Sequence, residues 1–167
     1  MSPKISSPAS SPRADPGATR ILAIDPGTNA TGFAILEEGR GGIVSVAHGV
    51  IRNPARAAPE GKLGRIQAGI EDLLSRHSPS AVVLEEVFHH VNVRAAIRLG
   101  EVRGVCLAAA ARAGVPVHSY AARRVKKAVV GFGAAGKGQV QGMVQALLSL
   151  PAPPPPPPAA GARGVGS

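Results

Sequence analysis

The sequence is poor in aromatic residues, cysteine and long apolar segments. Trp is absent and the aromatic residues make up 2% of the 167 residues, so the core must be aliphatic and rich in alanine. Cys106 is the single cysteine, which excludes a disulfide within the chain and is typical of a buried residue in a reducing compartment. No uncharged apolar run reaches the length of about 18 residues that a membrane span needs, and the N-terminus lacks the apolar core of a secretion signal. We therefore expect a cytoplasmic protein without a membrane segment.

Acidic residues are nearly missing from the second half of the chain. Residues 1–86 carry nine Lys or Arg and nine Asp or Glu, whereas residues 87–167 carry ten Lys or Arg and one acid, Glu101. The net charge of +9 therefore arises entirely in the second half, which favours a polyanionic partner such as nucleic acid. A solvated basic face is the alternative interpretation.

The length predicts one domain between two tails. We expect residues 1–19, rich in Ser and Pro, to form a disordered N-terminal tail, residues 20–150 to form the folded domain, and residues 151–167 to form a disordered tail that begins with proline runs. Within the domain, apolar periodicity and turn signals predict a hairpin over 20–36, strands over 43–51, 81–84 and 115–119, and helices over 62–76, 93–113 and 138–149.

Two of the predicted strands are buried apolar runs that end in an acid. Residues 21–24 lead to Asp25 and residues 81–84 lead to Glu85, whereas Glu86 has the opposite strand parity and should face away. If the two strands are parallel neighbours, both carboxylates meet at the carboxyl edge of one sheet, where open α/β folds bind ligands. A divalent cation between them would remove their repulsion, and hard oxygen ligands suit Mg²⁺ or Mn²⁺. A capping role for Asp25 in the following turn is the alternative.

Residues suited to DNA contact follow the second acid. Phe88 on an exposed connection could stack on bases, and His89 and His90 are more typical of phosphate contacts than of metal ligands. Arg94, Arg98 and Arg103 lie along the predicted helix 93–113, where Gly100 and Gly104 form a smooth stripe suited to close packing in the core or across a dimer. A basic cluster follows, for which we expect phosphate as the partner; it consists of Arg123, Arg124, Lys126 and Lys127. A glycine-rich loop comes next and ends at Lys137.

With these residues in view, the chain resembles the RuvC family of crossover junction endodeoxyribonucleases. The segments that carry the resemblance are ILAIDPGTNATGFAIL, VVLEEVF, RLGEVRGV, YAARRVKKAVVGFGAAGK and QVQGMVQALLSL, which together span roughly residues 20–155. The resemblance implies an α/β, RNase H-like fold with a mixed five-stranded sheet flanked by helices. It also implies a homodimer that nicks a four-way (Holliday) DNA junction symmetrically in recombination and repair, and a branch-migration helicase complex of the RuvA and RuvB type as partner.

The resemblance also implies roles for individual residues. Asp25 and Glu85 correspond to metal ligands, with Mg²⁺ as the expected ion, and Phe88 corresponds to an aromatic residue that touches DNA near the crossover. Lys126 and Lys137, eleven residues apart, correspond to lysines near the scissile phosphate. Together these residues define a site for phosphodiester hydrolysis assisted by two metal ions.

The C-terminal segment departs from the family pattern. The family's two last acidic positions are taken here by Pro158 and Gly161, the family's last helix is missing, and no acid follows Glu101. We therefore expect weak metal binding and poor cleavage, which leaves a catalytically impaired junction-binding homologue as the alternative function. A relative that acts on RNA junctions, and an actin-like nucleotide-binding domain, are further alternatives; the chain is too short for the two domains that the actin-like fold requires.

Overall fold

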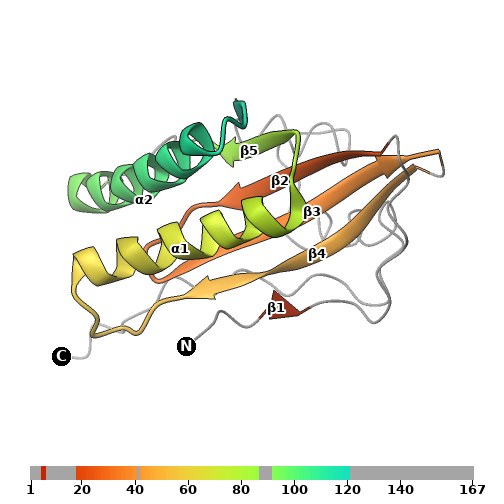
Figure 1. Ribbon diagram of the computed structural model, residues 1–167. Helices are drawn as coiled ribbons and strands as arrows, with labels where there is room; N and C mark the ends of the chain where they lie inside the picture. The colour runs from red at the N-terminus through yellow and green to blue at the C-terminus, as the bar shows by residue number, and fades with distance from the viewer. Residues whose placement is uncertain (1–4, 7–17, 41, 87–91, 121–167) are drawn as a thin grey trace.

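A single twisted sheet organises the molecule (Figure 1). The computed structural model describes residues 5–6, 18–40, 42–86 and 92–120. Its strands lie in the order β1-β4-β3-β2-β5-β6. They are β1 (Ile5–Ser6), β2 (Thr19–Asp25), β3 (Ala30–Gly39), β4 (Gly42–Arg52), β5 (Ala81–Glu85) and β6 (Val117–Tyr120).

The sheet is mixed because two kinds of connection build it. Short turns join β2, β3 and β4 into antiparallel neighbours, whereas helices carry the chain from β4 to β5 and from β5 to β6. The first crossover places β5 parallel to β2, and the second places β6 parallel to β5. Strands β2 to β6 confirm the predicted mixed five-stranded sheet. The two-residue strand β1, which pairs antiparallel with β4, was not predicted.

Two helices cover one face of the sheet (Figure 1). Helix α1 (Pro59–His77) buries an apolar stripe that includes Ile66, Ile70 and Leu73, and Ser78, in the left-handed conformation, caps its C-terminal end. Helix α2 (Val93–Arg112) buries a narrower stripe that includes Val102 and Cys106. These stripes meet the alternate strand residues that point toward the helices, so the core is a layer of aliphatic side chains between sheet and helices.

The predicted elements are found with modest shifts of their ends. Helix α1 begins three residues before the predicted residue 62, because Pro59 fits the first helical turn, where its missing N–H costs no hydrogen bond. Strand β6 begins two residues after the predicted residue 115. Gly100 and Gly104 are exposed on α2, so the alternative that their stripe packs within the core is wrong.

Several predictions concern residues that the structure does not describe. They are the C-terminal tail, the N-terminal tail apart from residues 5–6 and 18–19, and the helix over 138–149. The same holds for the candidate DNA-contacting and catalytic residues Phe88, His89, His90, Arg123, Arg124, Lys126, Lys127 and Lys137. Within the described part of the chain, no helix is long and apolar enough to cross a membrane.

Candidate functional site

The ends of β2 and β5 bring two carboxylates to one edge of the sheet. The parallel register pairs Ile24 with Leu84, so Asp25 and Glu85 occupy the next position on each strand. Ile24 and Leu84 are buried toward the helices, and the side chains that follow them therefore point to the opposite face of the sheet. This confirms that the two strands are parallel neighbours with their acids on the same face and edge. The role of these acids as metal ligands stays a prediction.

The turn after Asp25 is fixed by its own side chains. Thr31 is fully buried, and its hydroxyl donates a hydrogen bond to the backbone oxygen of Gly27 at 2.8 Å. A Cβ atom at Gly27 would lie only 2.3 Å from the backbone oxygen of Ala30, so the turn has no room for a larger residue there. Gly32 lies directly opposite Asp25 in the hairpin. The close turn fixes the backbone that follows Asp25, and a Cβ atom at Gly32 would lie 3.5 Å from the Cβ atom of Asp25.

Arg103 holds the backbone that carries Glu85. From α2, its guanidinium donates to the backbone oxygen of Glu85 at 2.9 Å and to the hydroxyl of Ser119 at 2.6 Å. One planar, permanently charged group thus ties the end of β5 to β6 and to α2. The helical spacing predicted that Arg103 lies on this helix but indicated no role for it, because its two partners lie 18 and 16 residues away along the chain.

The loop between β4 and α1 is tied to the turn beside Asp25. The backbone N–H of Asn53 donates to the backbone oxygen of Asn29 at 2.9 Å, and its side-chain amide donates to Thr28 at 2.8 Å. The ammonium of Lys62 donates to the side-chain oxygen of Asn29 at 2.9 Å and to the backbone oxygen of Ala55 at 3.1 Å. These contacts make the loop and the turn one rigid unit at the edge that carries the two acids.

Two groups with shifted pKa values lie away from this edge. Burial raises the pKa of the Cys106 thiol to about 11, so the thiol stays protonated, as expected for a core residue. Burial, together with neighbouring arginines, lowers the pKa of His77 at the end of α1. Neither group therefore contributes acid–base chemistry at the Asp25–Glu85 edge.

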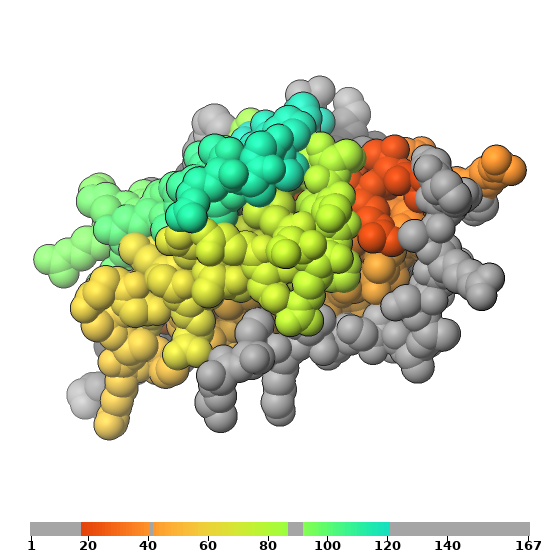
Figure 2. All heavy atoms as spheres, in the orientation of Figure 1, coloured from red at the N-terminus to blue at the C-terminus, as the bar shows by residue number. Residues whose placement is uncertain are grey.

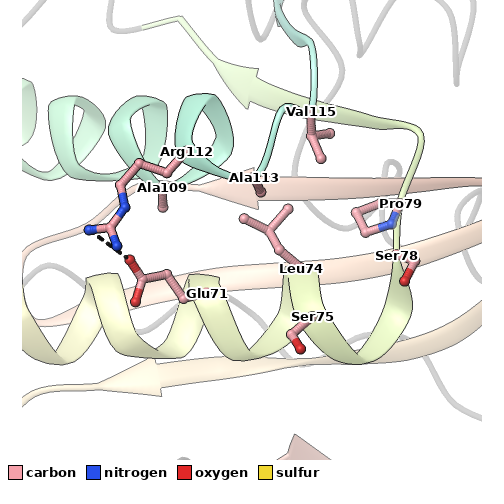
Figure 3. Close-up of a pocket in the computed structure, with 9 residues that line it drawn as sticks. All are labelled: Glu71, Leu74, Ser75, Ser78, Pro79, Ala109, Arg112, Ala113 and Val115. Atoms are coloured by element: carbon pink, nitrogen blue, oxygen red, sulfur yellow. Dashed lines mark ion pairs between the residues drawn. The ribbon is translucent and has the colours of Figure 1, made fainter.

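A pocket of about 460 Å³ lies between the C-terminal halves of α1 and α2 (Figure 3). An ion pair crosses it, with 3.7 Å between the guanidinium of Arg112 and the carboxylate of Glu71. Because this end of α1 leads into the start of β5, the pocket lies at the opposite edge of the sheet from Asp25 and Glu85. It is therefore separate from the candidate site.

The described residues supply part of a metal site. Asp25 and Glu85 are the oxygen donors that Mg²⁺ prefers, and they fit a divalent cation between two adjacent strand ends. No group of three or more His, Cys, Asp or Glu residues gathers within the described segments. Of the predicted DNA-contacting residues, Arg94 lies exposed in the first turn of α2, where the Asn92 side chain caps its N–H at 2.9 Å.

Comparison with known proteins gives one consistent family. The family model described as crossover junction endodeoxyribonuclease RuvC matches residues 21–166. The chain is 46% identical over 132 residues to the crossover junction endodeoxyribonuclease RuvC of Halorhodospira halophila, covering 79% of this chain and 78% of that protein. It is 45% identical over 133 residues to the protein of the same name from Trichlorobacter lovleyi, covering 79% and 74%.

Solved structures show the same relationship. The structure of T. thermophilus RuvC in complex with Holliday junction substrate matches with a TM-score of 0.78 and 32% identity, covering 83% of this chain and 84% of that chain. The yeast mitochondrial Holliday junction resolvase Ydc2 matches with a TM-score of 0.55 and 9% identity, covering 78% of this chain and 64% of that one, which supports the fold alone. The fold of this chain is therefore similar to that of T. thermophilus RuvC over most of its length.

Proposed function

The chain belongs to the RuvC family of crossover junction endodeoxyribonucleases, and we propose from this premise that it cuts four-way DNA junctions by divalent-metal-dependent hydrolysis. The observation that carries the proposal is the parallel register of β2 and β5, which brings Asp25 and Glu85 together on one face. Symmetric nicks at a junction would resolve it during recombination and repair. Mg²⁺ is the expected ion, with Mn²⁺ as a substitute.

The residues at the edge have distinct parts in this mechanism. A bound divalent cation would activate the attacking water and stabilise the charge on the leaving oxygen. Asp25 and Glu85 would hold that ion, and Arg103 keeps the backbone of Glu85 in place. Lys126 and Lys137 are proposed to neutralise the scissile phosphate, and Phe88 to touch the bases near the crossover. Arg94, Arg123, Arg124 and Lys127 would bind the DNA backbone.

Substitution of the two acids tests this function. We expect the unmodified chain to nick a synthetic four-way junction in Mg²⁺, and Asp25→Asn or Glu85→Gln to abolish nicking while junction binding in EDTA stays unchanged. Glu86→Gln is the matched control, because Glu86 follows Glu85 but lies beyond the end of β5. Nicking that persists in Asp25→Asn would contradict the proposed site.

A catalytically impaired junction-binding protein is the second candidate function. The absence of any acid after Glu101 favours it, since two Mg²⁺ ions need about four carboxylate ligands to complete their octahedral shells. This candidate predicts tight, salt-sensitive junction binding without nicking, and no effect of Asp25→Asn. The same nicking assay therefore separates the two functions.

We further propose that the chain forms a homodimer through α2. Val93, Ile97 and Leu107 are 72%, 58% and 37% exposed, and with Gly100 and Gly104 they recur at the spacing of one helix face. An exposed apolar stripe of this kind is typical of a protein interface. Light scattering should give the mass of a dimer, and Ile97→Lys should give a monomer. A dimer would place one site on each side of the junction.

Family membership also supports a branch-migration helicase complex of the RuvA and RuvB type as partner, and a cytoplasmic location beside the DNA. Co-purification with these helicase proteins on a junction would test the partner. Loss of co-purification when the junction is omitted would show that DNA bridges the proteins.

A further inference from the structure

We infer that Arg52 and Arg56 form a second phosphate-binding surface that holds DNA beside the cut, an inference that rests on the proposed function. Residues 52–62, here called the loop surface, connect β4 to the first turn of α1. In Figure 2, the orange-yellow segment that contains the loop surface forms the lower left corner of the molecule. The arrowheads of β2 and β5 point toward the same side in Figure 1.

The strand register places Arg52 on the same face of the sheet as the two acids. Gly32 pairs with Asp25 on one side and with Val50 on the other, so Val50 and Asp25 share a face. Arg52 lies two residues beyond Val50 and therefore points to that face as well. With strands ~4.8 Å apart and a rise of ~3.3 Å per residue, the Cα atoms of Arg52 and Asp25 are about 12 Å apart. That distance corresponds to about three to four base steps along the axis of a DNA duplex, at ~3.4 Å per step.

The loop surface carries an excess of positive charge. Residues 52–62 contain Arg52, Arg56 and Lys62 against one acid, Glu60, and Arg65 follows within α1. The three arginines are exposed, and none of them forms an ion pair with a described residue. This local excess is not visible in the overall composition of residues 1–86, where nine basic residues are balanced by nine acids.

The loop surface is also held rigidly at the site. Asn53 and Lys62 tie it to the turn at Thr28 and Asn29, which follows Asp25. A second turn within the loop is closed by the N–H of Ala57, which donates to the backbone oxygen of Pro54 at 3.1 Å. Because the backbone is fixed before DNA binds, little loop entropy is lost on binding. The surface can therefore set the position of the DNA relative to Asp25.

Phosphate contacts have a measurable signature in salt. Each contact to duplex DNA contributes about 0.9 to the slope of log K against log salt, which is about eightfold in affinity at 0.1 M relative to 1 M salt. A homodimer that loses one contact in each subunit would lose about 1.8 from this slope. Because phosphates carry no sequence information, the loss should be equal for junctions of different sequence.

The test uses the full chain and an immobile four-way junction in EDTA, with fluorescence anisotropy at several KCl concentrations. We expect Arg52→Gln, and more strongly Arg52→Gln with Arg56→Gln, to lower the salt slope and weaken binding, whereas Arg52→Lys should retain both. Arg40→Gln is the matched control: it removes the same charge from an exposed turn between β3 and β4, at the opposite edge of the sheet. Its slope should equal that of the unmodified chain.

Two results would overturn the inference. An unchanged slope in the double variant would show that the loop surface does not contact phosphates, and an equal loss in Arg40→Gln would show that overall charge alone matters. If the unmodified chain bound no junction, the proposed function would fail together with the inference. A chain that binds and nicks with an unchanged slope would refute only the loop surface.

Discussion

Replacement of Arg103 should weaken metal binding without weakening DNA binding. Arg103→Met keeps the length of the side chain but removes both hydrogen bonds, to the backbone oxygen of Glu85 and to Ser119. A hydrogen bond from a charged donor contributes about 1.5–3 kcal/mol, and water can replace part of it because Arg103 is half-buried. We therefore expect a loss of about 2 kcal/mol in the free energy of unfolding, which lowers Tm by about 4–8 °C in a domain of this size.

The same substitution should also weaken metal binding. Removal of a group that orients a metal ligand typically lowers metal affinity or activity by about 10- to 100-fold. Arg103→Met should therefore raise the Mg²⁺ concentration for half-maximal nicking by about tenfold or more. For Arg103→Lys, this Mg²⁺ concentration should lie between those of the unmodified chain and Arg103→Met, since an ammonium cannot make both hydrogen bonds of the guanidinium in the same geometry.

The assay measures the nicking rate against Mg²⁺ concentration and, separately, the junction affinity in EDTA. If the chain proves catalytically impaired, the increase of Tm with added Mg²⁺ reports metal binding without any turnover. Arg98→Met, an exposed arginine on the same helix, is the control. A lower Tm with an unchanged Mg²⁺ dependence would show that Arg103 only stabilises the fold, and the reasoning would be wrong.

Three further predictions concern residues of α1 and α2. Gly69→Ala should destabilise the fold by about 1–3 kcal/mol in chemical unfolding, because the new Cβ would lie 2.7 Å from a methyl carbon of Ile51. Gly64→Ala is the control, because Gly64 has open space around it, and it should stabilise the fold by up to about 1 kcal/mol. The Cys106 thiol, buried and with a pKa of about 11, should react with a thiol reagent only after denaturant is added. The pKa of His77 is lowered below 6.5 in the folded chain, so folding stability should fall as the pH drops below about 6.5, and His77→Gln should reduce this loss in unfolding curves at pH 7 and pH 5.

Much of the fold followed from local patterns. The apolar runs before Asp25 and Glu85 predicted two buried strands, and the helical spacing of Ile66, Ile70 and Leu73 predicted α1. These predictions succeeded because burial of one face dictates where apolar residues recur. The short strand β1 could not be predicted, since two residues carry no periodicity and their pairing with β4 depends on the rest of the sheet.

The sequence identified a residue of the candidate site only where an acidic residue stands at the end of a predicted strand. An acid after a buried strand is visible in the sequence, so Asp25 and Glu85 were identified. Arg103 was not assigned a role, because it acts on Glu85 through a hydrogen bond to the backbone oxygen. Every residue carries a backbone oxygen, so the sequence gives no signal for such a contact. Arg52 was not identified either, because in the sequence it is one of nine basic residues balanced by nine acids.

The sequence by itself determined the aliphatic core, the strands that end in acids and the basic second half, since these depend on residue type and spacing. Only the tertiary structure decided that β2 and β5 are adjacent in a register that matches Asp25 to Glu85, and that Arg52 shares their face. The physical reason is that register and crossover are fixed by the packing of α1 and α2 onto the sheet. That packing is a property of the whole chain and leaves no signal in any single segment.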